Sequence, residues 1–267
     1  MPSTQPVVIQ LTGITTQFGR HVVHHDLELS VLEGEILCIV GGSGSGKTTL
    51  LREMLGLDQP TKGTIKILGT ALSEVGPEEL IALRRHSGVL FQRGALFSAL
   101  TVAENVALPL RELRAYDEEL IRELALLRLE MVGLSRGDGD KMPAELSGGM
   151  IKRAALARAL ALEPRIVFLD EPTAGLDPES SDTFVELIRE LHRELRLSVV
   201  MVTHDLDTLV AVADRVAVLA DQRVIVAAPI QEVIRFAHPF IQHYFLAGRG
   251  RRALTALSAP ASAVSHH

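Results

Sequence analysis

An eight-residue glycine-rich segment, Gly-Gly-Ser-Gly-Ser-Gly-Lys-Thr at positions 41–48, constrains the fold of this chain more than any other feature. It has the pattern G-x-x-x-x-G-K-[ST] and lies between an apolar run, residues 35–40, and a helix-like run, residues 49–55. A strand must deliver such a loop and a helix must begin at its end, because backbone N–H groups and the helix dipole then both face a chain of phosphates. The sequence therefore predicts a P-loop that binds a nucleoside triphosphate.

The residue types in this loop each have a chemical reason. Glycines permit backbone conformations that a side chain would strain. Lys47 supplies a positive charge for the β and γ phosphates of ATP, and the hydroxyl of Thr48 can ligate Mg²⁺. The residues of this segment that we expect to contact ATP are Gly41, Gly42, Ser43, Gly44, Ser45, Gly46, Lys47, Thr48 and Thr49.

Composition excludes several classes of protein. The chain has 267 residues, 47% of them hydrophobic, which is enough for one large domain or two small ones. Its net charge of -6 and its lack of Trp argue against nucleic acid as a partner. The single cysteine, Cys38, lies in the apolar run before the P-loop, so we expect a buried side chain and no disulfide framework.

Membrane insertion is not expected from the sequence. Residues 1–6 lack the basic and apolar regions of a signal peptide. The apolar region after Leu209 is interrupted by Asp214, Arg215 and Asp221, so it is too short to span a bilayer. We expect a cytoplasmic chain that contacts a membrane only through a partner.

The pattern of strands and helices indicates an α/β fold. Two early runs, residues 7–12 and 26–31, alternate apolar and polar side chains, as half-buried antiparallel strands do. Later β-branched runs alternate with helical patterns, which predicts a P-loop NTPase core with a mainly parallel sheet. These later runs are residues 64–67, 87–91, 165–169, 198–203 and 215–219.

Helical signals replace strand signals between Gln92 and about Ala155. Apolar residues recur there at helical spacing and predict a helix over 116–132; they are Leu120, Ile121, Leu124, Leu127 and Met131. We therefore predict one ATP-binding domain over residues 1–240, with a catalytic core at about 1–92 and 156–235 and an inserted helical subdomain at about 93–155. Residues 241–267 form a C-terminal extension, and the Ala/Ser-rich composition from Ala253 predicts disorder at its end.

A second phosphate-related motif follows the helical region. Residues 165–172, Arg-Ile-Val-Phe-Leu-Asp-Glu-Pro, form an apolar strand that ends in two acids, which resembles a Walker B element. Asp170 can hold Mg²⁺, and Glu171 can polarise the water that attacks the γ-phosphate.

The segment Leu-Ser-Gly-Gly-Met at 146–150, followed by a helical run, resembles the signature of ATP-binding cassette (ABC) ATPases. Ser147 and the N–H groups of Gly148 and Gly149 would form a helix N-terminus that attracts anions. The resemblance implies that this terminus reaches the γ-phosphate of ATP held by the opposite subunit. Two subunits would then enclose two nucleotides in a two-fold dimer.

Four further residues match the ABC family in its expected order. Gln92 corresponds to the Q-loop glutamine, which senses Mg²⁺ and the attacking water, and Asp177 in Ala-Gly-Leu-Asp to the acid of the D-loop at the dimer interface. His204 resembles the switch histidine that contacts the γ-phosphate. Phe18 stands where the family places an aromatic side chain on adenine, with an ordinary core phenylalanine as the alternative.

Departures from the commonest ABC pattern indicate a subfamily. Met150 ends the signature where Gln is usual, residues 93–97 continue the Q-loop as Arg-Gly-Ala-Leu-Phe, and residues 237–248 form a closing C-terminal segment. All three resemble the Mla-type ATPases of MCE phospholipid transport systems. The resemblance implies an ATPase on the cytoplasmic face of the inner membrane that powers phospholipid transport between membranes. Its implied partners are a transmembrane permease, an MCE substrate-binding protein and a small STAS-domain protein.

Other functions stay open at this point. A small-solute importer and a regulatory ABC ATPase without transport both fit the same catalytic residues. Translation factors and chromosome-maintenance ATPases fit less well, because the chain has one P-loop and only 100 positions separate Lys47 from Ser147. The cargo, the choice of homodimer or heterodimer, and the role of Arg249, Arg251 and Arg252 do not follow from the sequence.

Overall fold

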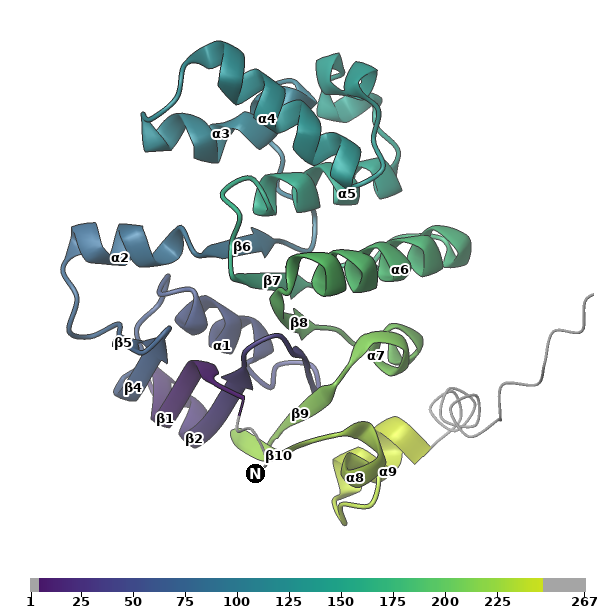
Figure 1. The fold of residues 1–267 in the computed structure, drawn as a ribbon. Coiled ribbons are helices and arrows are strands. Elements are labelled where there is room, and N and C mark those ends of the chain that lie inside the picture. The colour runs from purple at the N-terminus through teal and green to yellow at the C-terminus, as the bar shows by residue number, and fades with distance from the viewer. Residues whose placement is uncertain (1–4, 247–267) are drawn as a thin grey trace, which may run out of the picture.

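The computed structural model describes residues 5–246, so the C-terminal residues from Ala253 and the three arginines at 249, 251 and 252 lie outside the described part of the chain. Figure 1 shows a helical layer above a central sheet, with a second sheet beside it near the N-terminus. The central sheet has the strand order β10-β9-β3-β8-β7-β6. The second sheet has the order β2-β1-β4-β5.

The central sheet confirms the predicted mainly parallel core. Its strands β3, β6, β7, β8 and β9 pair in parallel, and only β10 runs antiparallel, against β9. All five residues of β8 are buried, as expected for a strand covered on both faces. The strands are β3 Ile36–Gly41, β6 Ser87–Leu90, β7 Ile166–Asp170, β8 Ser198–Val202, β9 Arg215–Ala220 and β10 Arg223–Ala228.

The second sheet is antiparallel and corrects one prediction. The run at residues 64–67, expected in the parallel sheet, instead pairs antiparallel with β1, where Ile9 faces Ile67 and Leu11 faces Ile65. The physical reason is the burial of this strand on one face only. Ile65 and Ile67 are apolar and buried, and the other face is exposed to solvent, which is common in antiparallel sheets and rare in parallel ones. The strands are β1 Val7–Phe18, β2 His21–Leu32, β4 Lys62–Ile67 and β5 Thr70–Ala71.

The helical layer at the top of Figure 1 lies between β6 and β7 in the chain. Thr101 and Glu104 form a capping box at the start of α3, and Asp117 caps α4. The elements are α3 Val102–Leu113, α4 Glu118–Met131, η1 Arg136–Asp140, η2 Pro143–Glu145 and α5 Gly148–Ala159. They coincide with the region for which a helical subdomain is predicted, except that α5 continues past residue 155.

Helix α4 forms where the sequence predicts a helix, but its buried face differs from the apolar spacing. Ile121 is 2% exposed, whereas Leu120 and Leu127 are 43% and 46% exposed. The helix packs against α3 and α5 through a face that also contains Ala125 and Leu129. Ala125 and Arg128 are therefore buried with the apolar residues of this face, while the two large apolar residues Leu120 and Leu127 face outward.

The remaining helices cover the central sheet. Helix α1 packs between the two sheets, with Leu50, Leu51 and Met54 in a core shared with β1, β2 and β3. Helix α9 buries Ile241 and Phe245 in the other core and spans residue 240, the predicted domain boundary. These helices are α1 Lys47–Met54, α2 Pro77–Arg84, α6 Pro178–Leu195, α7 Leu206–Val212, α8 Ile230–Val233 and α9 Pro239–Leu246. Among residues 5–246, no helix has both the length and the apolar character that crossing a membrane requires.

Gly88 allows β6 to approach α5, and this contact gives a test of the fold. A Cβ atom at residue 88 would lie closer than 3.0 Å to the main-chain oxygen of Ala159. We predict that Gly88→Ala lowers the free energy of unfolding by about 1–3 kcal/mol, measured by urea denaturation, because the overpacked backbone cannot move away. At Gly76, an added Cβ meets nothing within 4 Å, so Gly76→Ala should cost less than about 1 kcal/mol. Equal losses in both variants would contradict the packing of β6 on α5.

Candidate functional site

The predicted P-loop joins the end of β3 to the start of α1. Two of its glycines have left-handed backbones, Gly44 with φ 76° and Gly46 with φ 94°. Gly41 is required for a different reason, since a Cβ there would lie closer than 3.0 Å to the main-chain oxygen of Leu219 and to the hydroxyl of Ser45. The loop conformation therefore depends on glycine at each of these positions.

Several hydrogen-bond donors of the P-loop lie close together and still have N–H or O–H groups available for a ligand. No side chain caps the N-terminus of α1 at Gly46, so its first N–H groups are available to an anion. The hydroxyl of Ser45 is buried and has no partner among the described residues. Lys47 Nζ donates to the main-chain oxygens of Gly41 and Gly42, at 2.9 Å each, and an ammonium has a third N–H to give. This donor set fits a chain of phosphates.

The acids predicted at the end of β7 lie near this lysine. Burial raises the pKa of Asp170, and the charge of Glu171 raises it further. Burial likewise lowers the pKa of Lys47, while the charges of Glu171 and Asp170 oppose that shift. Lys47 and the two carboxylates thus share one electrostatic environment, in which the ammonium favours the ionised form of Asp170.

The oxygen donors at this edge fit Mg²⁺. The carboxylate of Asp170 forms no hydrogen bond or ion pair with another described residue, although its main chain pairs with Val202 in the sheet, and the hydroxyl-bearing Thr48 is exposed. Mg²⁺ is typically held by one or two protein ligands together with phosphate oxygens. Accordingly, the described residues contain no cluster of three or more His, Cys, Asp or Glu that could hold a metal without such a substrate. Thr48, Asp170 and Gln92 remain the ligands that we expect.

Glu171 and His204 are brought together, although 33 positions separate them. The Nδ1 atom of His204 lies 2.8 Å from Oε2 of Glu171, and the main-chain N–H of His204 is 3.3 Å from the same oxygen. Glu171 has a left-handed backbone, φ 48°, held by its N–H bond to the oxygen of Val202. Backbone strain of this kind is typical of residues whose side chain must be aimed for function.

Lys152 is a residue of this site that the sequence did not reveal. It lies on α5, is 5% exposed, and its Nζ donates to the main-chain oxygens of Gln92 and Glu171. One buried ammonium therefore connects the signature helix, the Q-loop and the acid expected to act on water. The available signal was a Lys-Arg pair in an alanine-rich helix, and the sequence does not tell which of the two points inward.

The signature residues form the N-terminus of α5. The hydroxyl of Ser147 accepts a hydrogen bond from the N–H of Met150 at 3.2 Å, and both Ser147 and Gly148 are exposed. Within the part of the chain that the structure describes, no hydrogen bond joins this terminus to the P-loop. The structure thus leaves the Ser147-Gly148-Gly149 terminus available to a nucleotide held elsewhere.

Two further predicted residues lie at exposed positions. Asp177 caps α6, where its Oδ1 accepts from the N–H of Ser180 at 2.9 Å, and this bonding lowers the pKa of Asp177. Phe18 ends β1 and is 57% exposed, so its ring is free to stack on a base rather than packed in a core. By contrast, Cys38 is fully buried, and burial raises the pKa of its thiol, as expected for a structural cysteine.

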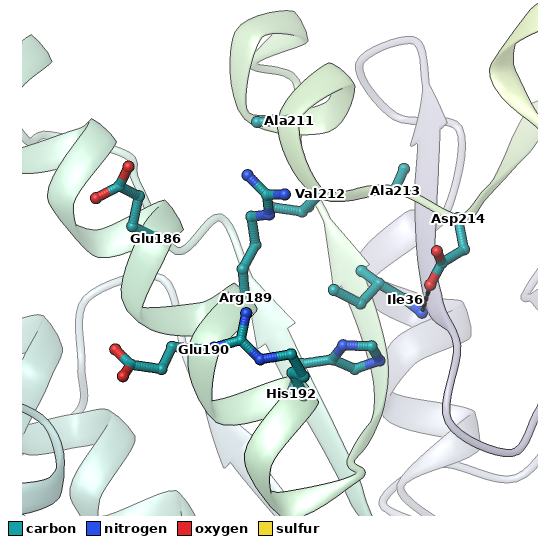
Figure 2. Close-up of a pocket in the computed structure, with 10 residues that line it drawn as sticks. Ile36, Glu186, Arg189, Glu190, His192, Ala211, Val212, Ala213 and Asp214 are labelled. Atoms are coloured by element: carbon teal, nitrogen blue, oxygen red, sulfur yellow. Dashed lines mark hydrogen bonds between the residues drawn. The ribbon is translucent and has the colours of Figure 1, made fainter.

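A large cavity elsewhere does not overlap the predicted site. It measures about 660 Å³ and is lined by residues of α6 and α7 and by the start of β3 and β9. Figure 2 shows Glu186, Arg189 and His192 on one side of it and Asp214 on the other. Oδ2 of Asp214 accepts a hydrogen bond from the main-chain N–H of Ile36 at 2.8 Å. Since Ile36 begins β3 and the P-loop follows its end, the cavity lies at the opposite edge of the sheet.

Comparison with known proteins identifies the family. The family model for ABC transporters matches residues 24–174. The intermembrane phospholipid transport system ATP-binding protein MlaF of Haemophilus influenzae is 41% identical, over 85% of this chain and 86% of its own. The methionine import ATP-binding protein MetN of Ralstonia nicotianae is 43% identical, over 82% of this chain and 63% of its own.

A solved structure supports the fold and indicates an assembly. A dimeric ATP-binding cassette in a post-hydrolysis state, bound to ADP and Pi, superposes with a TM-score of 0.76 and 34% identity. The match covers 83% of this chain and 98% of the solved one. That protein is a dimer, which agrees with the self-dimer that the resemblance to the ABC family implies.

The contacts of Lys152 predict a specific kinetic defect. In Lys152→Met, Glu171 and Gln92 lose a shared anchor while the P-loop keeps its contacts. We predict that kcat for ATP hydrolysis falls about tenfold while KM for ATP changes less than about twofold.

Arg153→Met is the matched control, because Arg153 also donates to a main-chain oxygen, that of Val132 at 2.6 Å, but away from the site. It should leave kcat within about twofold of the wild type. An equal loss of kcat in both variants would show that α5 had merely been destabilised.

Proposed function

The chain belongs to the ABC transporter family as an ATP-hydrolysing subunit, and we propose that its transporter moves phospholipid between two membranes. The observation that supports this most directly is the similarity to MlaF over 86% of that protein's length. The Q-loop continuation at residues 93–97 and Met150 in the signature, both noted in the sequence, favour the same subfamily.

In the mechanism that we propose, the two half-sites come from two copies of the chain. ATP binds to the N–H groups of the P-loop and to Lys47 on one copy, with Phe18 against the base. The exposed terminus at Ser147-Gly148-Gly149 of the other copy then meets the γ-phosphate, and Asp177 lies at the interface. Closure of the dimer would move the attached permease.

The hydrolytic step rests on charge and positioning. Glu171 accepts a proton from the attacking water, and His204, held 2.8 Å from this carboxylate, orients it and faces the γ-phosphate. Lys47 stabilises the negative charge that spreads over the phosphate oxygens. Mg²⁺, bound by Thr48, Asp170 and Gln92, would neutralise phosphate charge. Since a single water is the nucleophile, no covalent intermediate on the protein is needed.

An apolar groove offers a contact for the permease. A mostly apolar cavity of about 560 Å³ lies between β6, the segment after Gln92, α3 and α5, and Phe91, Phe97 and Pro109 line it. Phe97 is 59% exposed, although it is a large apolar side chain. We propose that a cytoplasmic helix of the permease docks here, because an apolar groove of this kind accepts an amphipathic helix. This contact would attach the chain to the inner membrane peripherally.

A second candidate function follows from the similarity to MetN. The identity of 43% is comparable with that to MlaF, so the transporter could import a small solute such as an amino acid. The cassette does not touch the cargo in either system, and the nucleotide site would act in the same way. The two functions therefore differ in the permease that the groove receives.

The partner distinguishes these functions. The chain should be captured from gently solubilised membranes and the recovered proteins identified by mass spectrometry. The lipid proposal predicts a multi-span permease with a single-span MCE protein, and a small STAS-domain protein beside them. An importer permease would replace the lipid function by the second candidate, and recovery of only soluble proteins would contradict transport altogether.

A pair of variants tests whether the permease binds at the apolar groove. Phe97→Asp should reduce recovery of the permease about tenfold, because a charge would be buried in an apolar contact. Leu127→Asp is the control, since Leu127 is also an exposed apolar residue, 46% exposed, but lies on α4 outside the groove. Similar recovery with both variants would place the permease elsewhere.

A further inference from the structure

A fully buried polar cluster lies beneath the P-loop and takes no part in the mechanism above. His24 of β2 and Glu53 of α1 are both 0% exposed, and Thr16 of β1 is 3% exposed. The Nδ1 atom of His24 lies 3.4 Å from Oε2 of Glu53, and the hydroxyl of Thr16 donates to Oε1 of Glu53. The cluster therefore ties the antiparallel sheet to the helix that follows the P-loop.

This cluster is costly for a protein core. Both ring nitrogens of His24 and Oε2 of Glu53 lack a hydrogen bond within the described residues. Buried ionisable groups destabilise a fold unless they are well paired, and apolar residues of similar volume would usually be at least as stable. Stability alone therefore does not account for a histidine and a glutamate at these two positions.

The imidazole touches the phosphate-binding loop at its last glycine. A Cβ atom at Gly46 would lie closer than 3.0 Å to Nε2 of His24 and to Cγ1 of Val23. Gly46 has φ 94° and is the N-cap of α1, so its backbone sets the direction of the first N–H groups of the helix. Anything that fixes Gly46 also fixes the donors that face the phosphates.

We propose that His24 and Glu53 form a positioning pair that holds the Gly46 end of the P-loop and thereby sets the affinity of the chain for the phosphates of ATP. Thr16 anchors Glu53, Oε2 of Glu53 lies against Nδ1 of the imidazole and keeps the ring in place by charge and contact, and the imidazole limits the movement of Gly46. The proposal rests on the proposed function in one respect, namely that this P-loop is where ATP binds. Since Glu171 and His204 lie at the ends of other strands, the pair should act on binding and leave the hydrolytic step unchanged.

Nucleotide binding to the full-length chain tests the pair. We expect His24→Ala to raise the Kd for ATP, measured with a fluorescent ATP analogue by competition, and the KM for ATP about tenfold, with kcat within about twofold of the wild type. Glu53→Leu should have a similar effect, because the ring loses its partner. Glu53→Gln, which keeps the volume and an acceptor for Thr16, should retain most of the affinity.

Comparison of Glu53→Leu with Glu53→Gln distinguishes a positioning role of Glu53 from a packing role. If the cluster only filled space, the apolar Glu53→Leu would bind ATP at least as well as Glu53→Gln, and that result would overturn the proposal. Thr16→Val preserves shape and removes only the anchoring hydroxyl, so it serves if His24→Ala fails to fold. Thr16→Val should raise the Kd for ATP about threefold. A Kd equal to that of the wild type in all three variants, Thr16→Val, Glu53→Gln and Glu53→Leu, would also overturn the proposal.

A second ion pair, in which the acid is buried and the arginine is half-buried, supplies the matched control. Arg215 Nη1 lies 3.0 Å from Oε1 of Glu35, which is 3% exposed and directly precedes β3, at the end opposite the P-loop. Glu35→Gln should lower thermal stability and leave the Kd for ATP unchanged. A wild-type chain that binds no ATP would reject the proposed function itself, whereas equal binding by wild type and all cluster variants rejects only the positioning pair.

Discussion

The nucleotide site depends on one constraint, the burial of β3 on both faces. Leu37 and Ile39 pack into the core that contains α1, while Cys38 and Val40 pack into the core beneath the helical layer and α9. A strand fixed on both sides ends at a defined point, and at that point Gly41 lies so close to Leu219 that a Cβ atom would clash with the main-chain oxygen of Leu219. Two hydrophobic cores therefore position the P-loop, and they fix the direction of α1 relative to the other residues of the site.

The other functional residues are arranged around that fixed strand. Neighbouring parallel strands end at the same edge, so Asp170 of β7 and the residues after β8 come close to Lys47 without any local sequence relation. Lys152 then connects this edge to the signature helix and to the main chain of Gln92, the residue after Phe91 in the groove that we propose for the permease. If the permease docks as we propose, a movement of the groove would reach Glu171 through this buried side chain.

Much of this arrangement could be predicted from the sequence, because the motifs and the strand patterns are local. The runs that form β7 to β9 are mostly apolar and β-branched, and the P-loop is flanked by a strand pattern and a helix pattern. The pairing of β4 could not be predicted in this way, since it depends on β1, some fifty residues earlier in the chain. The inward position of Lys152 and the contact of His24 with Gly46 were also missed, because both follow from tertiary packing. The roles of the site residues stay predictions, which the substitutions of Lys152 and Glu171 test.

The central claim is that two copies of this chain complete each other's ATP sites. Sedimentation velocity of the purified Glu171→Gln variant tests it most directly, because this change should allow ATP binding and block hydrolysis. The account predicts a 29.0 kDa monomer without nucleotide and a species of twice that mass with ATP and Mg²⁺. A variant that binds ATP and stays monomeric at the same protein concentration would contradict the shared site.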